Sequence, residues 1–253
     1  MLRTLLIALF ACLAVPSAAP AEEWREEGPR TLVMTYRVPA AARLSFRDAV
    51  RDQTLPRLTA LKAAGDLDSY HVLVSRYADA QSWDMLVILN FHGPAALARW
   101  RTVEETAPAG LGPKALKLVG QVESAPGDMM REKISPQPAA EAPVYLVVPY
   151  DYLVSTDAYL AYVDGYLLPQ ADGWIEEGAI SSYGIFLPRY AAGRTWSSLL
   201  ILAYRGDAGL ARRDSVVKTV RARLSPVPEW KAFAENKTKI RDEKVPMIAD
   251  ELL

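Results

Sequence analysis

The chain has 253 residues, of which 51% are hydrophobic and 23% charged, and its formal net charge is −1. These proportions are typical of a globular protein with a sizeable apolar core. They exclude a disordered chain, a collagen-like chain and a small disulfide-rich scaffold. The 29 basic residues against 30 acidic ones provide no positive excess to attract a polyanion. We therefore expect no nucleic-acid partner.

Residues 1–21 have the pattern of a secretory signal peptide. Arg3 supplies a positive start, residues 5–15 form an apolar stretch, and Ala19-Pro20-Ala21 offers small residues for cleavage. The stretch is too short to span a bilayer, and no later stretch has the length and apolar character of a transmembrane helix. We expect the mature chain to be periplasmic or secreted after cleavage near Ala21.

The single cysteine, Cys12, lies inside this leader segment. After cleavage the chain would have no thiol for a disulfide, a metal site or a nucleophile. An alternative is that Cys12 carries a lipid anchor, because the residues before it loosely resemble a lipoprotein signal. The bulky Phe10 and the apolar residues after Cys12 make this alternative the less favoured one.

The rest of the sequence predicts two runs of elements in the same order. The first run consists of a strand at 31–38, a helix at 45–64, a hairpin of strands 69–77 and 84–92, a helix that begins after Gly93, a helical stretch at 114–124 and a weak strand near 129–134. The second run consists of the matching segments 144–154, 156–177, 182–190 with 197–205, a helix after Gly206, 229–237 and 240–245. Within the long helices, Pro56 and Pro169 predict a kink or a break, and Gly65 and Gly178 predict the C-terminal ends.

The two runs are also similar in sequence. When the chain is shifted by 113 residues, residues 55–97 align with 168–210 without a gap, and 15 of the 43 positions are identical. The identical pairs include Pro56/Pro169, Gly65/Gly178, Arg76/Arg189, Trp83/Trp196 and Gly93/Gly206. A repeat of this length indicates two small domains of one fold. We predict domains at 31–134 and 144–253, joined by a Pro/Ala-rich linker at 135–143.

The order β-α-β-β-α-β defines a ferredoxin-like unit, whose sheet carries helices on one face only. The other face is apolar and needs a partner, and two copies in one chain can cover each other. In element order and duplication the chain resembles the dimeric α+β barrel superfamily, which includes small cofactor-free monooxygenases, haem-degrading enzymes and stress-responsive barrel proteins. The resemblance implies an α+β fold in which two tandem ferredoxin-like domains form one intramolecular barrel, as a monomer or a weak dimer.

The only two histidines of the chain are candidate site residues, because an imidazole can move protons or bind a metal near neutral pH. If Tyr77 lies opposite Asp84 in the first hairpin, His71 lies opposite Asn90 and Ser69 opposite His92, and these four side chains share one face of the strands. A plainer interpretation stays open, in which this is a solvated strand end with two surface histidines.

The second copy differs at the equivalent positions, where it has Ser182, Gly184, Ala203 and Arg205. Across a barrel this difference predicts an asymmetric pocket with the histidines on one wall and Arg205 nearby. The predicted ligand-binding residues are Ser69, His71, Asn90, His92 and Arg205, of which His71, Asn90 and His92 are also the catalytic candidates. Two histidines and an amide lack a third firm ligand, so we predict no metal site, and we expect no cofactor.

Haem-degrading members of the superfamily use an asparagine, a tryptophan and a histidine, and this chain has Asn90, Trp83 and His92 in one segment. Because side chains alternate along a strand, Trp83 and His92 point to opposite faces, and we do not carry the triad over.

Several other side chains have structural interpretations. Arg76 and Arg189 are predicted to form ion pairs, with an anion site as the alternative. Trp83 and Trp196 are predicted to fill the core or an interface. The tyrosines at 159, 162 and 166 have helical spacing that predicts a core stripe, with a phenol-lined pocket as the alternative.

The leading hypothesis from sequence is an exported protein that binds a small apolar or aromatic molecule without covalent catalysis. One alternative is a cofactor-independent monooxygenase or a related enzyme that uses His71, Asn90 and His92. Another is a structural or interaction module. The residues alone do not decide whether the chain is an enzyme.

Overall fold

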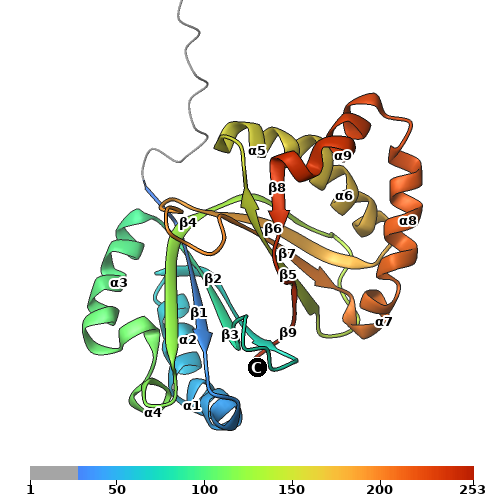
Figure 1. The fold of residues 1–253 in the computed structure, drawn as a ribbon. Coiled ribbons are helices and arrows are strands. Elements are labelled where there is room, and N and C mark those ends of the chain that lie inside the picture. Colours follow the sequence, from blue (N-terminus) through green and yellow to red (C-terminus); the bar gives the residue numbers. More distant parts are fainter. Residues whose placement is uncertain (1–27) are drawn as a thin grey trace, which may run out of the picture.

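The computed structural model describes residues 28–253 (Figure 1). The predicted signal peptide and Cys12 lie outside the described residues, so the expectations for them stay predictions. None of the helices between residues 28 and 253 has the length and apolar character needed to cross a bilayer.

Eight antiparallel strands form a closed barrel. Their order is β7-β6-β4-β1-β3-β2-β9-β5, and a pairing of β5 with β7 closes the ring. A ninth strand, β8, pairs with the end of β5 that β9 leaves free. The strands are β1 (Thr31–Arg37), β2 (Leu67–Ser75), β3 (Met85–Phe91), β4 (Gln121–Ile134), β5 (Val144–Tyr152), β6 (Ile180–Pro188), β7 (Ser198–Tyr204), β8 (Arg241–Glu243) and β9 (Met247–Glu251). The chain is therefore a mixed α+β protein built around a closed barrel.

Helices cover the outside of this barrel in two groups on opposite sides (Figure 1). The first group is α1 (Arg43–Ala49), α2 (Leu55–Ala63), α3 (Pro94–Thr106) and α4 (Pro113–Leu116), with the short 3-10 turns η1 (Ala40–Ala42) and η3 (Pro108–Gly110). The second group is α5 (Thr156–Tyr162), α6 (Leu168–Glu176), α7 (Gly206–Ala211), α8 (Arg213–Leu224) and α9 (Pro228–Ile240). Two π-helical turns, η2 (Val50–Thr54) and η4 (Val163–Leu167), join α1 to α2 and α5 to α6.

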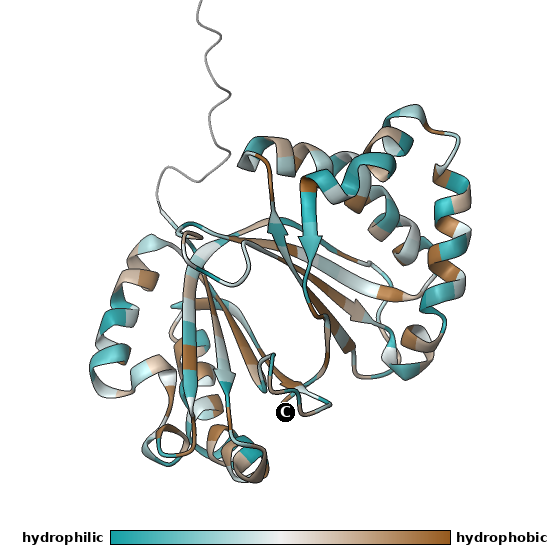
Figure 2. Cartoon of the chain, viewed as in Figure 1, coloured by the Kyte–Doolittle hydropathy of each residue, from teal (hydrophilic) through white to brown (hydrophobic). Residues whose placement is uncertain are grey.

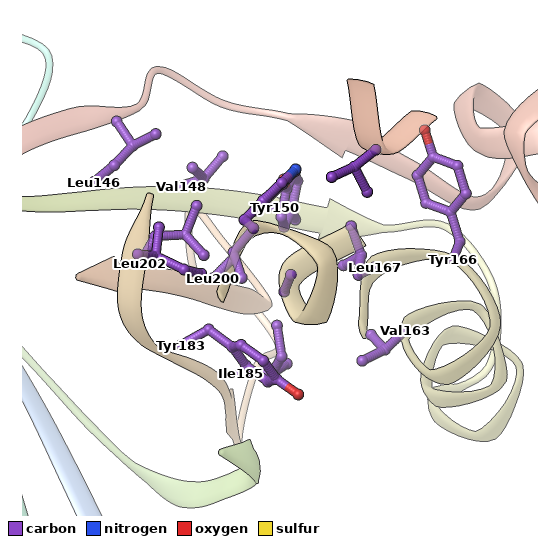
Figure 3. Close-up of a cluster of buried hydrophobic side chains, with 14 of the residues drawn as sticks. Leu146, Val148, Tyr150, Val163, Tyr166, Leu167, Tyr183, Ile185, Leu200 and Leu202 are labelled. Atoms are coloured by element: carbon purple, nitrogen blue, oxygen red, sulfur yellow. The ribbon is translucent and has the colours of Figure 1, made fainter. Parts of the chain in front are cut away.

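Three clusters of buried apolar side chains form the core. One lies between the first helix group and strands β1–β3, a second between the second group and β5–β7, and a third fills the barrel itself. Figure 2 shows the apolar colour along the strands and on parts of the helices, beside polar helix segments. Figure 3 shows part of the second cluster, to which Val148 and Leu200 come from strands and Val163 and Leu167 from η4. Because β1, β2, β3, β5, β6 and β7 bury residues on both faces, these strands are rich in consecutive apolar residues.

The stripe of tyrosines belongs to this second cluster. Tyr159, Tyr162 and Tyr166 are almost completely buried. Their rings stack, with centroids 6.2 Å apart for the first pair and 5.0 Å for the second. The core interpretation of this stripe is therefore confirmed.

The prolines at 56 and 169 do not break their helices. The N–H of Leu55 donates to the carbonyl of Val50, and the N–H of Leu168 donates to that of Val163, each five residues back. This wider turn lets each proline begin a new helical segment, where its missing N–H costs nothing. The predicted break is replaced by a π-turn in both helices.

The glycine ends of these helices are confirmed. Gly65 and Gly178 have positive φ values of 78° and 69°. After the first helix, the N–H of Asp66 donates to the carbonyl of Leu61 at 3.0 Å, the bond that marks a Schellman end. A side chain at either position would be strained in this left-handed conformation.

Two predicted segments need correction. The helical stretch at 114–124 is wrong beyond the short α4, because β4 already begins at Gln121. Gly120 and Pro126 oppose a helix there. At the other end of the chain the predicted strand 240–245 corresponds to the short β8 (Arg241–Glu243), but the prediction misses the longer β9 (Met247–Glu251). Pro246 separates β8 from β9, so the pattern of one continuous strand is lost.

Candidate functional site

The inner face of the barrel has an apolar middle and two polar ends. The side chains that fill the middle include Val33, Leu73, Leu86, Ile88, Val147, Phe186, Leu199 and Met247. Side chains alternate along a strand, so residues two positions away from these also point inward. At one end they are Ser69, His71, Asn90, Tyr145 and Glu251, which we call the histidine end. At the other end they include Arg37 and Glu123, beside Trp83 and Trp196, which we call the tryptophan end.

The register of the first hairpin differs from the prediction by two residues. Asn90 lies opposite Ser69, and His71 lies opposite Ile88. The difference arises at the turn, where Val74 pairs with Met85 and the N–H of Ser75 donates to the carbonyl of Asp84. A bulge near the start of β2 then shifts the pairing by one more residue, so that Leu67 pairs with Phe91. A shift of two residues keeps every side chain on its face, so Ser69, His71 and Asn90 still share the inner face.

Glu251 holds the imidazole of His71. Nδ1 of His71 lies 3.1 Å from Oε2 of Glu251, and the N–H of Val72 donates to Oε1 of the same carboxylate at 3.1 Å. A carboxylate only accepts hydrogen bonds, so Nδ1 carries the proton in this contact. Nε2 of a neutral His71 is then the acceptor, and no residue within 28–253 forms a hydrogen bond to it.

Tyr145 completes this cluster from β5. Its hydroxyl lies 3.4 Å from Nδ1 of His71, and the two rings are 6.0 Å apart. Burial raises the pKa of Tyr145 well above its ordinary value, and the Glu251 carboxylate raises it further by its charge and by a hydrogen bond. Tyr145 is therefore a neutral phenol whose hydroxyl can donate a hydrogen bond to the Glu251 carboxylate.

Asn90 is fixed by two neighbours on the same face. The hydroxyl of Thr31 donates to Oδ1 of Asn90 at 3.0 Å, and Nδ2 of Asn90 donates to the Ser69 hydroxyl at 2.8 Å. This leaves the second hydrogen of Nδ2 available for a ligand oxygen.

A cavity of about 50 Å³ lies at the histidine end. The residues that line it include His71, Asn90 and Tyr145 from one part of the barrel and Ser182 and Gly184 from the facing strand. Gly184 makes room here, because a Cβ at this position would lie 2.8 Å from Sδ of Met129. The structure thus brings His71 and Asn90 together with the small residues Ser182 and Gly184 of the second copy in one lining.

Two of the predicted site residues lie elsewhere. His92 is outside the lining of this cavity, its side chain is 76% exposed, and its Nδ1 contacts Asp68 at 2.8 Å. Arg205 binds the connection between β4 and β5, where it donates to the carbonyls of Gln137 and Pro138, both at 2.8 Å. The bulge in β2 and the strand end at Phe91 account for His92, which lies beyond the last paired residue.

The repeated arginines form ion pairs, as predicted. Arg76 bonds Asp250 at 2.8–3.0 Å and also pairs with Asp207. The hydrogen bonds to Asp250 and Asp207 raise the pKa of Arg76 above its ordinary value. Arg189 pairs with Asp128 at 3.1 Å. The two contacts link strands that the chain connects only through long segments.

Two residues of the histidine end were missed from the sequence, namely Tyr145 and Glu251. Both lie in strands that reach His71 only through the closure of the barrel. The sequence signal was present for Tyr145, which is a polar-tipped ring in an apolar strand. No local signal identifies Glu251, because the strand that carries it was not predicted.

The histidine end fits neither a metal ion nor haem. Between residues 28 and 253 no three His, Cys, Asp or Glu side chains come together in a way that could hold a metal. The cavity beside His71 has about 50 Å³, room for one or two waters and not for a porphyrin, and Nδ1 of His71 already binds Glu251.

No family model matches this chain, and no curated protein matches it. Solved structures do match its fold. A candidate monooxygenase from Fusobacterium nucleatum is 12% identical with a TM-score of 0.57, and the match covers 90% of this chain and 94% of that one. A candidate monooxygenase from Lactobacillus acidophilus is 10% identical with a TM-score of 0.56, over 90% and 95%. An anthrone oxidase-like protein is 11% identical with a TM-score of 0.54, over 89% and 91%. These matches confirm the expected α+β barrel as the fold of the chain.

Proposed function

We propose that this protein is a cofactor-independent, monooxygenase-like enzyme that acts on a small organic molecule at the histidine end. The observation that carries the proposal is the contact between Nδ1 of His71 and Glu251, which leaves Nε2 as a proton acceptor on the inner face of the barrel. The same arrangement of carboxylate and imidazole prepares a histidine for general-base catalysis in other enzymes. The names of the three structural neighbours support this class of reaction.

The substrate class follows from the groups present. Nε2 of His71 removes a proton from a C–H bond activated by a neighbouring carbonyl, and the second Nδ2 hydrogen of Asn90 stabilises the resulting enolate oxygen. The carbanion gives an electron to dioxygen, the two radicals join in a C–O bond, and protonation yields a hydroperoxide. Removal of the second C–H proton then breaks the O–O bond and releases water. A CH2 group and O2 thus become a carbonyl and H2O.

The cavity is large enough for the reacting atoms only, and the rest of the substrate would lie outside it. About 50 Å³ admits a reacting group or a dioxygen molecule but not a whole substrate. The side chain of His71 is 42% exposed, so the rest of the substrate can lie over the open end of the barrel. The apolar side chains of Ile88, Met129 and Ile201 in the lining suit dioxygen better than water.

Oxygen uptake with anthrone as the probe substrate tests the proposal. We expect His71→Ala to lower the rate by about 10²- to 10⁴-fold, the range for loss of a general base. His92→Ala is the matched control, since it removes an exposed histidine that lies outside the cavity. If His71→Ala is folded and takes up oxygen at the same rate as wild type, the proposed role of His71 as a base is wrong.

We also propose that the chain is exported and that its barrel arose from two tandem ferredoxin-like units, 31–134 and 144–253. The repeat supports the second point, as do the matching strand pairs, since Arg37 lies opposite Gln121 and Tyr150 lies opposite Glu243. A binding protein without turnover is the other candidate. Native mass spectrometry of the exported protein distinguishes the two, because a retained ligand that survives incubation in air favours binding alone.

A further inference from the structure

A second cavity lies at the tryptophan end of the barrel and takes no part in the proposed function. It has a volume of about 430 Å³, within the range of pockets that bind small organic ligands. Its lining combines Trp83, Trp196 and Pro149 with polar side chains from both halves of the chain. The apolar middle of the barrel separates it from the histidine end.

Two buried tryptophans form part of the wall of this cavity. Both indoles are buried and belong to the cluster inside the barrel. Nε1 of Trp83 is a buried donor without a hydrogen-bond partner among residues 28–253. An unpaired donor is uncommon in a wall that only fills space, and it is expected in a wall that meets a polar ligand atom.

The charges in the lining are balanced except at Arg37. The guanidinium of Arg37 donates to the carbonyl of Gln81 at 3.3 Å and forms no ion pair within residues 28–253. The other charged groups are all paired, Glu123 with Arg194 at 2.8 Å, Glu243 with Arg241 at 3.2 Å and Lys244 with Asp151 at 3.7 Å. The cavity therefore presents one uncompensated positive charge beside an aromatic wall.

We propose that the tryptophan end binds a planar aromatic carboxylate. Its ring lies against the indoles of Trp83 and Trp196, and its carboxylate pairs with Arg37, whose fork of donors matches two carboxylate oxygens. The inference rests on this cavity alone and does not depend on catalysis at His71.

Titration calorimetry of the purified full chain tests this with 2-naphthoate as the ligand and neutral 2-naphthamide as its matched analogue. We expect one molecule of 2-naphthoate to bind, and Arg37→Gln to weaken it about tenfold or more, as loss of a charge-assisted pair does. Arg37→Lys should retain only part of the affinity, because an ammonium keeps the charge but loses the two-pronged pairing with the carboxylate. Arg101→Gln, on the exposed side of α3, and His71→Ala should both bind as wild type does.

Three results would overturn the proposal. The first is that wild type does not bind 2-naphthoate at millimolar concentration. The second is that wild type and Arg37→Gln bind 2-naphthoate with equal affinity. The third is that Arg37→Gln weakens the binding of neutral 2-naphthamide as much as it weakens the binding of 2-naphthoate. If Arg37→Gln does not fold, NMR of the wild type replaces this comparison. The indole N–H resonance of Trp83 is then followed, and its assignment comes from its disappearance in Trp83→Phe. A shift of this resonance on adding 2-naphthoate supports the site, and an unchanged resonance refutes it. Loss of oxygen uptake in His71→Ala together with intact 2-naphthoate binding shows that the two sites are separate.

Discussion

Replacing Asp84 by alanine should destabilise the tryptophan end of the barrel strongly. Oδ2 of Asp84 accepts the N–H of Val38 at 2.7 Å, and Oδ1 pairs with Nε of Arg43 at 2.8 Å. The carboxylate thus joins the start of β3 to the end of β1 and to α1. Only 12% of its side chain is exposed, so water replaces these partners poorly.

The size of the effect follows from the groups left behind. Asp84→Ala leaves the Arg43 cation and the Val38 N–H without their acceptor. Breaking a buried ion pair by removing one partner costs about 3–5 kcal/mol. Arg43 keeps some access to water and a hydrogen bond to the Ser75 carbonyl at 2.8 Å, so we expect the lower limit, about 3 kcal/mol. For a chain of this size that lowers Tm by about 6–12 °C.

Thermal unfolding followed by circular dichroism measures this shift. Asp48→Ala is the matched control, because Asp48 pairs with Arg51 on the surface and its side chain is 67% exposed. Such a pair is worth less than about 1 kcal/mol. If Asp84→Ala lowers Tm no more than Asp48→Ala does, the reasoning about this buried pair is wrong.

Three further predictions concern the barrel and the aromatic core. Gly184→Ala should cost less than about 1 kcal/mol, because the new Cβ would meet Met129 Sδ at 2.8 Å but this flexible side chain can turn away; a larger loss in unfolding by urea would refute this. Tyr159→Phe should cost about 1 kcal/mol, because it removes the buried hydrogen bond at 2.9 Å to Ser198 Oγ, and the same assay measures it against Tyr77→Phe on the surface. Burial raises the pKa of Tyr162 to about 12, so its neutral form is favoured by folding. The corresponding stability is present below about pH 10 and is lost as the pH rises towards 12, which phenolate absorbance and circular dichroism should show together.

The sequence predicts much of the architecture because its signals are local. Both hairpins and the glycine ends of the long helices follow from neighbouring residues. The sequence also predicts that His71 points to the same face as Ser69 and Asn90. This prediction is correct despite a register error of two residues, because side chains alternate with period two along a strand. The facing small residues Ser182 and Gly184 were found through the repeat.

The missing parts depend on contacts distant in sequence. In the first half Arg37 of β1 lies opposite Gln121 of β4, and in the second half the equivalent Tyr150 of β5 lies opposite Glu243 of β8. The first strands of the two halves are therefore 113 residues apart in sequence, but the last strands are 122 residues apart. Because of these extra residues, the ungapped comparison of the two halves does not reveal β9, and it therefore does not reveal Glu251. The π-turns before the prolines were also beyond reach, because a proline in a helical pattern predicts a break unless tertiary packing supports the wider turn.

The role of His71 as a base depends on which of its ring nitrogens carries the proton, and nitrogen-15 NMR of the two imidazoles measures this directly. His92→Ala assigns the remaining signals to His71. We expect the neutral ring of His71 to carry its proton on Nδ1 and to have a bare Nε2, and we expect Glu251→Gln to disturb this preference. A proton on Nε2 of neutral His71, or a tautomer that ignores Glu251, would contradict the account, because the histidine end would then have no base.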